Sequence, residues 1–280
     1  MSDKIFNYLN NFLNKNLSKL KWLNRLVAII CLYLLFQIFL NNDFSLSWSQ
    51  NLLIFPFILL IGYMFQSINW SLIISHKFKK EMIMSWFLSL IGKYFPFKIG
   101  VPLLRLTKDI DTDKADTKKY FLGVIYEVCY QIIAGTIIVI FYLITKFYNF
   151  SFVFALVSFL IILLIASKLT SSQKPLLLLT SSLSYVFYIL GIYLFLSKLG
   201  YSTELDIAVA YIGFSIVSLL FIGSPAGIGI REYLFITLFQ TQGVLENSEY
   251  LQIAVLIRII FVFSDFIGYT IFKIIELTNK

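Results

Sequence analysis

Several apolar runs in this chain are long enough to cross a lipid bilayer, and this feature restricts the fold more than any other. A membrane-spanning helix needs about 20 predominantly apolar residues, and such runs cover residues 52–74, 120–144, 176–196 and 251–275. Of the 280 residues, 59% are hydrophobic and 14% are charged, whereas soluble domains carry about 25% charged residues. The sequence therefore predicts an all-α polytopic membrane protein.

The charges between the apolar runs predict the orientation of the chain. Lys and Arg are concentrated in the cytoplasmic loops of membrane proteins. The loops 76–80 and 107–120 are rich in lysine, whereas the loops 41–51, 200–206 and 241–250 carry acidic residues and no Lys or Arg. We therefore expect the first two inside and the other three outside. The net charge of +8 then indicates contact with anionic lipid headgroups rather than with nucleic acid.

These assignments divide the chain into three parts. Residues 1–25 alternate lysines with leucines at helical spacing, which predicts a basic amphipathic helix on the inner membrane surface. Residues 26–275 form a single integral-membrane domain, in which the shorter spans 26–40 and 150–166 join the four long ones. Residues 276–280 form a cytoplasmic tail. The expected location is the cytoplasmic membrane, with both termini inside.

Two further apolar segments are interrupted by glycine and proline. Residues 82–105 lie between two basic loops and residues 207–240 between two acidic ones, so each enters and leaves the membrane on one side. We expect about six to seven membrane-spanning helices plus two oppositely oriented re-entrant broken-helix hairpins, an inverted-repeat-like arrangement with a substrate site between the breaks. The alternative for the second segment is a span over 207–222 followed by an interfacial helix. The residues assigned to the breaks are Pro96, Gly100, Pro225, Gly227 and Gly229.

Charged residues within apolar segments are candidates for function, because a charge in the hydrocarbon region needs a partner or a cavity. Arg231 and Glu232 directly follow the second break, where a new helix would present free N–H groups to an anion. With Arg105 and Arg258 they predict a phosphate site, since the guanidinium group binds two phosphate oxygens at once. Glu232 and Glu127 would balance these arginines, carry protons or contact an amine-bearing headgroup.

Other polar residues in the spans have simpler interpretations. Asp265 shares a helix face with the arginine seven residues before it, and pairs either with that residue or across the bundle as a structural ion pair. Lys93 and Lys98 are expected to extend to the inner membrane interface. Gln131 lies one helical turn after Glu127 on the same face.

The remaining chemistry-bearing residues do not indicate an enzyme. Cys31 and Cys129 lie in apolar runs without CxxC spacing and are expected to be small buried hydrophobic residues. His76 lies in a basic loop and is expected to be solvated. The sequence contains no P-loop, GxSxG or HExxH motif, so no catalytic residue, cofactor or metal site is predicted.

The segment "SPAGIGIREYLF" at 224–235 resembles the hallmark of the transmembrane domain of lysylphosphatidylglycerol synthases, which stand-alone flippase-like membrane proteins share. The segment "GKYFPFKIGVPLLRL" at 92–106 takes the place of an earlier family motif, and Glu127 and Arg258 match charged positions of the family. This chain departs from the pattern at Val101, Val128 and Gln131, where the family has charged residues. The resemblance implies translocation of a phospholipid or a lipid-linked glycan headgroup, without aminoacylation.

Two alternatives to translocation stay open. One is a membrane accessory protein of polysaccharide or glycolipid synthesis that binds a lipid-linked intermediate without moving it. The other is a membrane-embedded transferase, for which Glu127 or Glu232 would be the base. The expected partners are membrane lipids and envelope-biosynthesis enzymes. The oligomeric state is left open, including a homo-oligomer.

Overall fold

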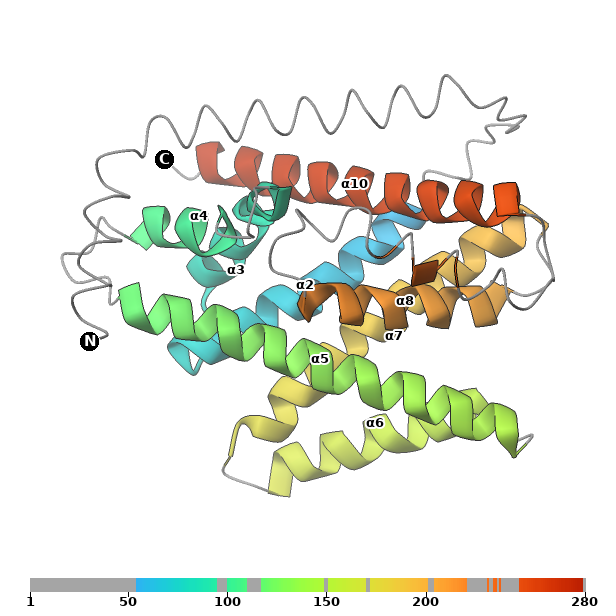
Figure 1. Cartoon of the computed structure of the whole chain (residues 1–280). Helices are drawn as coiled ribbons and strands as arrows, with labels where there is room; N and C mark the ends of the chain where they lie inside the picture. Colours follow the sequence, from blue (N-terminus) through green and yellow to red (C-terminus); the bar gives the residue numbers. More distant parts are fainter. Residues whose placement is uncertain are drawn as a thin grey trace.

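The regular elements in the described part of the chain are all helices in the computed structural model, and no β-strand occurs there (Figure 1). The structure describes residues 54–94, 100–109, 117–148, 151–169, 172–200, 204–220, 231, 234–235, 237 and 247–278. The predictions that lie outside these residues concern the segments 1–25 and 26–40 and the single residues Cys31, Pro96, Lys98, Pro225, Gly227, Gly229 and Glu232.

In the part of the chain that the structure describes, four helices are long and apolar enough to cross a membrane, and they coincide with the four long apolar runs of the sequence. Each extends beyond its apolar run, because polar residues at the ends continue the helix. At the carboxyl end this extension includes residues 276–278, which were predicted to belong to a tail. The four helices are α2 (Ile54–Ser75), α5 (Thr117–Phe147), α7 (Lys174–Lys198) and α10 (Asn247–Thr278).

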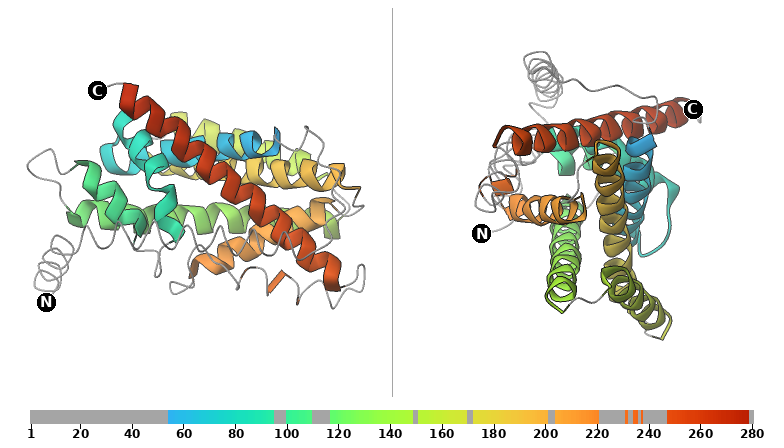
Figure 2. Two further views of the ribbon diagram at one scale, coloured as in Figure 1. Left: turned by 90° about the horizontal axis from the view of Figure 1, so that it is seen from above. Right: turned by 90° about the vertical axis from the view of Figure 1, so that its right-hand side faces the viewer.

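Two shorter apolar helices also belong to the described part of the bundle. α6 (Phe152–Leu169) corresponds to the predicted span 150–166, and α8 (Glu204–Leu220) corresponds to the apolar part of the segment 207–240. α10 and α6 lie on opposite sides of the bundle, and α10 crosses the other helices obliquely (Figure 2).

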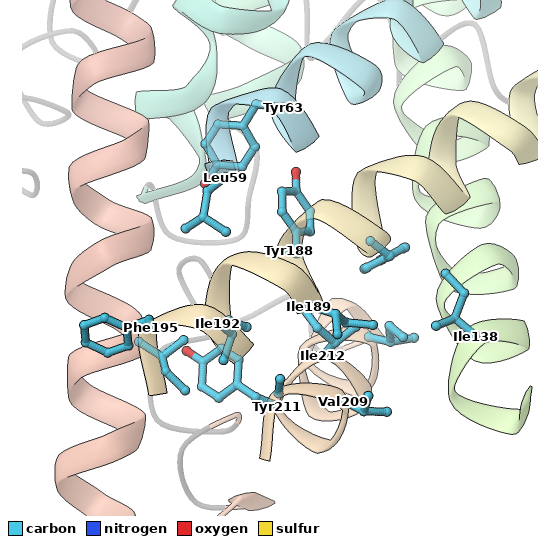
Figure 3. Packing of buried hydrophobic residues seen from close by; sticks show 14 of the residues in the cluster. Leu59, Tyr63, Ile138, Tyr188, Ile189, Ile192, Phe195, Val209, Tyr211 and Ile212 are labelled. Carbon is cyan, nitrogen blue, oxygen red and sulfur yellow. The ribbon is translucent and has the colours of Figure 1, made fainter. Parts of the chain in front are cut away.

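The centre of the bundle is the packing of α2 against α7. A Cβ atom on Gly62 of α2 would overlap the ring of Tyr188 of α7, and a Cβ atom on Gly191 would lie 2.9 Å from Leu59. The absence of these side chains lets the two helices approach closely, so that aromatic rings fill the space between them. Tyr63 and Tyr188 pack edge to face with ring centroids 5.6 Å apart (Figure 3).

The bundle carries apolar side chains on its outside and polar side chains inside. On α5, for example, Phe121, Ile133 and Leu143 are all exposed, and an apolar outer surface of this extent suits lipid rather than water. The protein is therefore membrane-embedded. The buried polar residues include Ser67, Asn69, Ser71, Ser85, Ser89, Arg105, Glu127, Thr145, Thr180, Ser181, Ser182, Ser184, Ser218, Arg258, Ser264 and Asp265.

The prediction of a buried side chain at Cys129 is wrong. Its thiol is free and exposed, on the same face of α5 as the exposed Ile125 and Ile133 one turn away on either side. An apolar residue of a membrane helix satisfies the hydrophobic effect equally well against lipid, so apolarity alone does not predict burial here. His76, by contrast, lies in a loop as expected, with its Nδ1 3.2 Å from Oε1 of Gln173.

The segment between α2 and α5 is broken into short pieces. α3 (Lys80–Leu88) and α4 (Gly100–Asp109) have 9 and 10 residues, which at ~1.5 Å per residue is about half of a ~30 Å hydrocarbon core. The 3₁₀ helix η2 (Leu90–Tyr94) follows α3 directly. Gly100 opens α4, and Gly92 of η2 packs directly against it.

The contact between η2 and the start of α4 yields a test of this broken segment. A Cβ atom on Gly92 would lie 2.6 Å from the carbonyl carbon of Gly100 and 2.7 Å from its oxygen. Because both neighbours are backbone atoms, Gly92→Ala should lower the free energy of unfolding by about 1–3 kcal/mol, measured by thermal unfolding in detergent. Gly213→Ala is the matched control, since its Cβ would meet only Val139 at 3.7 Å. Equal stability of the two variants would contradict this packing.

Candidate functional site

A cavity of about 250 Å³, lined by charged, polar and apolar side chains, lies between the helices of the bundle. Residues from α2, α3, η2, α4, α5, α7, α8 and α10 line it, together with Arg231, which follows α8 in the chain. Four of the five residues predicted to bind a headgroup therefore meet at one cavity, although they come from distant parts of the sequence. The charged residues that line it are Lys93, Arg105, Glu127, Arg231, Arg258 and Asp265.

Arg105 and Glu127 form a buried ion pair on one wall of the cavity. Nη1 of Arg105 lies 2.5 Å from Oε2 of Glu127, and the two residues are only 3% and 4% exposed. Trp86 Nε1 donates to Oε1 of Glu127 at 2.6 Å, and Arg105 Nε donates to Ser89 Oγ at 3.0 Å. The guanidinium also lies 4.0 Å from the ring centroid of Trp70. Hydrogen bonds and the aromatic ring thus replace the water that both charges lose.

A second ion pair joins η2 to α10. Nζ of Lys93 lies 2.5 Å from Oδ1 of Asp265, and the hydroxyl of Tyr94 donates to Oδ2. Lys93 was expected at the membrane interface, but its side chain is only 29% exposed. Its ammonium group is directed to a carboxylate that is 1% exposed, because an unpaired buried carboxylate would be costly. Asp265 thus pairs across the bundle.

Arg231 has weaker contacts with the protein than Arg105 has. Its Nη2 lies 3.4 Å from Ser218 Oγ, and its guanidinium carbon is 5.4 Å from the ring centroid of Tyr211. Its Nε is buried and has no hydrogen-bond partner among the residues that the structure describes. A buried donor in this state is normally completed by water or by a ligand. Arg231 is therefore the strongest candidate for a ligand contact.

Among the residues that the structure describes, more cationic side chains than carboxylates line the cavity. Among the described lining residues, four cationic side chains face two carboxylates. Each of the four carboxylate oxygens already accepts a hydrogen bond from Lys93, Tyr94, Trp86 or Arg105. Cationic side chains in an environment of low dielectric constant interact strongly with a negative charge. Such a site attracts an anion.

Sequence reasoning missed the uncharged part of the lining. The cavity is bordered by aromatic and hydroxyl-bearing side chains that do not stand out in apolar runs. One signal was present: Trp86, Ser89 and Lys93 recur at helical spacing on one face, and Gln131 shares the face of Glu127 as expected. The uncharged polar and aromatic residues of the lining are Tyr63, Gln66, Trp86, Ser89, Tyr94, Gln131, Tyr185, Tyr188, Ser215, Ser218 and Phe261.

The described residues contain no cluster of three or more His, Cys, Asp or Glu side chains that would hold a metal ion. Both oxygens of Glu127 accept hydrogen bonds, one from Arg105 and one from Trp86. Comparison of the chain with protein-family models, with curated proteins and with solved structures finds no match.

Proposed function

We propose that this protein moves a phospholipid or a lipid-linked glycan across the cytoplasmic membrane by guiding its headgroup through the cavity. The observation that carries the proposal is a cavity lined by Arg105, Arg231 and Arg258 within a bundle that has an apolar outer surface. A phosphate group is the common feature of these headgroups, and arginines are the residues that bind phosphate best. Arg105, Arg231 and Arg258 would hold it, with Glu127 and Glu232 balancing their charge.

The size of the cavity supports transfer of the headgroup alone. Its volume of about 250 Å³ is just below the ~300 Å³ at which pockets for drug-sized ligands begin. A phosphate with one small polar group would fill it, while the acyl chains of the lipid would stay in the surrounding bilayer. Only the polar part of the lipid then needs a path through protein.

The broken segments are part of the same proposal. We interpret α3, η2 and α4 as the re-entrant hairpin 82–105, and the segment 207–240 as a second hairpin that enters from the opposite side, among six to seven spans. The shortness of α3 and α4 and the contact of Gly92 with Gly100 support the first hairpin. Two broken helices facing a central site are a recurring design in transporters. Both termini would then lie inside.

The accessory protein is the main alternative, because it would need the same cavity. The cavity would bind a headgroup equally well in an accessory protein that presents a lipid-linked intermediate to envelope-biosynthesis enzymes. A transferase that used Glu127 as its base is disfavoured, because Glu127 is held in an ion pair with Arg105.

Reconstitution distinguishes these functions. Vesicles containing the purified protein and a trace of an acyl-labelled anionic phospholipid should lose the outer-leaflet label to a membrane-impermeant quencher and then expose the inner-leaflet label, at a rate above that of protein-free vesicles. Binding of the lipid without faster exchange would favour the accessory protein. Conversion of the lipid to a new product would favour the transferase.

A further inference from the structure

We propose that the loop between α2 and α3, together with the start of α7, docks anionic phospholipid headgroups at the inner surface of the membrane. The docking surface consists of Lys77, Phe78, Lys79 and Lys80 of the loop and its flank, and of Lys174 of α7. None of these residues lines the cavity. The inference goes beyond the proposed function, because it requires only that the protein is membrane-embedded.

The backbone of this loop is held by serines at the end of α2. Ser71 is 0% exposed, and its Oγ donates to the carbonyl oxygen of Lys77 and accepts from the N–H of Lys79, both at 2.8 Å. Ser75 Oγ donates to the same carbonyl oxygen at 2.8 Å. These backbone groups are satisfied within the protein, while the side chains of residues 77–80 are exposed. The loop therefore presents its side chains from a fixed backbone.

A second set of hydrogen bonds joins the loop to the start of α7. Nε2 of Gln173 donates to the carbonyl oxygen of His76 at 2.9 Å, and Nδ1 of His76 lies 3.2 Å from Oε1 of Gln173. Gln173 directly precedes Lys174. These contacts bring a lysine from a distant part of the chain to the same end of the bundle as the lysines of the loop.

The four lysines of the docking surface are available to an external anion. All four are exposed, and within the described part of the chain none of them forms an ion pair with a carboxylate. The segment 76–81 carries three lysines and one acidic residue, Glu81. Basic loops between membrane spans face the cytoplasm, where the negative potential of anionic lipids attracts lysine side chains. The charge of the docking surface thus complements anionic headgroups.

An exposed phenylalanine lies among these lysines. Phe78 is 62% exposed, and the backbone hydrogen bonds of its two neighbours hold it there. An exposed phenyl ring is unfavourable in water but favourable at the boundary between headgroups and acyl chains. α2 is long enough to cross the membrane and ends at Ser75, so a residue three positions later lies close to that boundary. This position favours a lipid surface over a soluble acidic protein as the partner.

Local quenching of a fluorophore on the loop tests the proposal. A bimane label is attached to Phe78→Cys in a chain that also carries Cys31→Ser and Cys129→Ser, and the protein is placed in phosphatidylcholine nanodiscs. Phosphatidylglycerol or phosphatidylcholine with a nitroxide near the headgroup is then added in increasing amounts. We expect half-quenching at about fivefold less labelled phosphatidylglycerol, because one lysine near the surface attracts an anionic lipid by about this factor.

Two controls make the result specific to the docking surface. Replacement of its four lysines by glutamine should make the two lipids equally effective. The matched control position is Tyr148→Cys, which replaces a 72% exposed aromatic residue just after α5. The lysine nearby, Lys146, is paired with Asp206 at 2.8 Å, so a label at residue 148 should show no preference. Thermal unfolding of each variant checks that the fold is kept.

Each outcome decides one point. Equal quenching by the two lipids at residue 78, or the same preference at residue 148, would overturn a specific anionic-lipid dock. A preference that persists without the four lysines would overturn their role. Absence of quenching by either lipid would overturn a lipid partner and favour an acidic soluble protein. These results leave translocation through the cavity untouched, because Arg231→Gln tests it separately.

Discussion

Replacing Arg231 by glutamine is expected to reduce headgroup transfer in reconstituted vesicles by about 100-fold while the protein stays folded. The guanidinium has a buried Nε without a hydrogen-bond partner among the described residues, and its described contacts are a long 3.4 Å contact with Ser218 and the ring of Tyr211 at 5.4 Å. It therefore contributes little to the fold and is available to a phosphate. Two charge-assisted hydrogen bonds to phosphate, each worth about 1.5–3 kcal/mol, account for the expected loss.

Two further variants make this result specific. Arg231→Lys keeps the charge but loses the planar fork, so it should retain an intermediate rate. Lys146→Gln removes a positive charge from an exposed ion pair with Asp206 at the end of α5 and should not alter transfer. A rate in Arg231→Gln equal to that of Lys146→Gln would remove Arg231 from the mechanism. Thermal unfolding of each variant shows whether a lost rate reflects misfolding.

Replacing Glu127 by alanine is expected to lower the free energy of unfolding by about 3–5 kcal/mol, because it leaves a buried guanidinium without its counter-ion. Arg105 is 3% exposed, and Trp86 would lose its acceptor at the same time. The measurement is thermal or denaturant unfolding in detergent, followed by intrinsic fluorescence.

The double variant Arg105→Met with Glu127→Gln should restore most of this loss. It removes both charges, and the amide oxygen of glutamine still accepts from Trp86. Glu81→Ala is the control, because Glu81 is exposed in the first turn of α3 and its replacement should change stability by less than about 0.5 kcal/mol. If Glu127→Ala were as stable as Glu81→Ala, the buried ion pair would not exist as described.

The long helices could be predicted because the length of an apolar run and the thickness of a bilayer are directly related. Which face of each helix points inward could not, as Cys129 illustrates. In a soluble protein an apolar residue is driven inward by water, whereas a membrane helix meets apolar surroundings on both sides. The side facing lipid is then chosen by packing, for example by the approach of α7 to Gly62 of α2.

The charged residues of the candidate site could be predicted, because a charge in an apolar segment is costly and therefore indicates a partner or a cavity. Arg105, Glu127 and Arg258 were candidates because each lies in an apolar segment, and the structure brings them to one cavity with Arg231. The pairing of Lys93 with Asp265 was not predicted. It depends on the direction in which η2 continues after α3. Tertiary packing sets this direction, and the spacing of residues along one helix does not predict it.

The most direct test of a phosphate-binding cavity inside the bundle is mass spectrometry of the lipids retained on gently purified protein. The proposed site predicts that a phosphate-containing lipid co-purifies with the wild-type chain and with Lys146→Gln, and that it is largely lost from Arg231→Gln. The same lipids in the same amounts on all three proteins would contradict it.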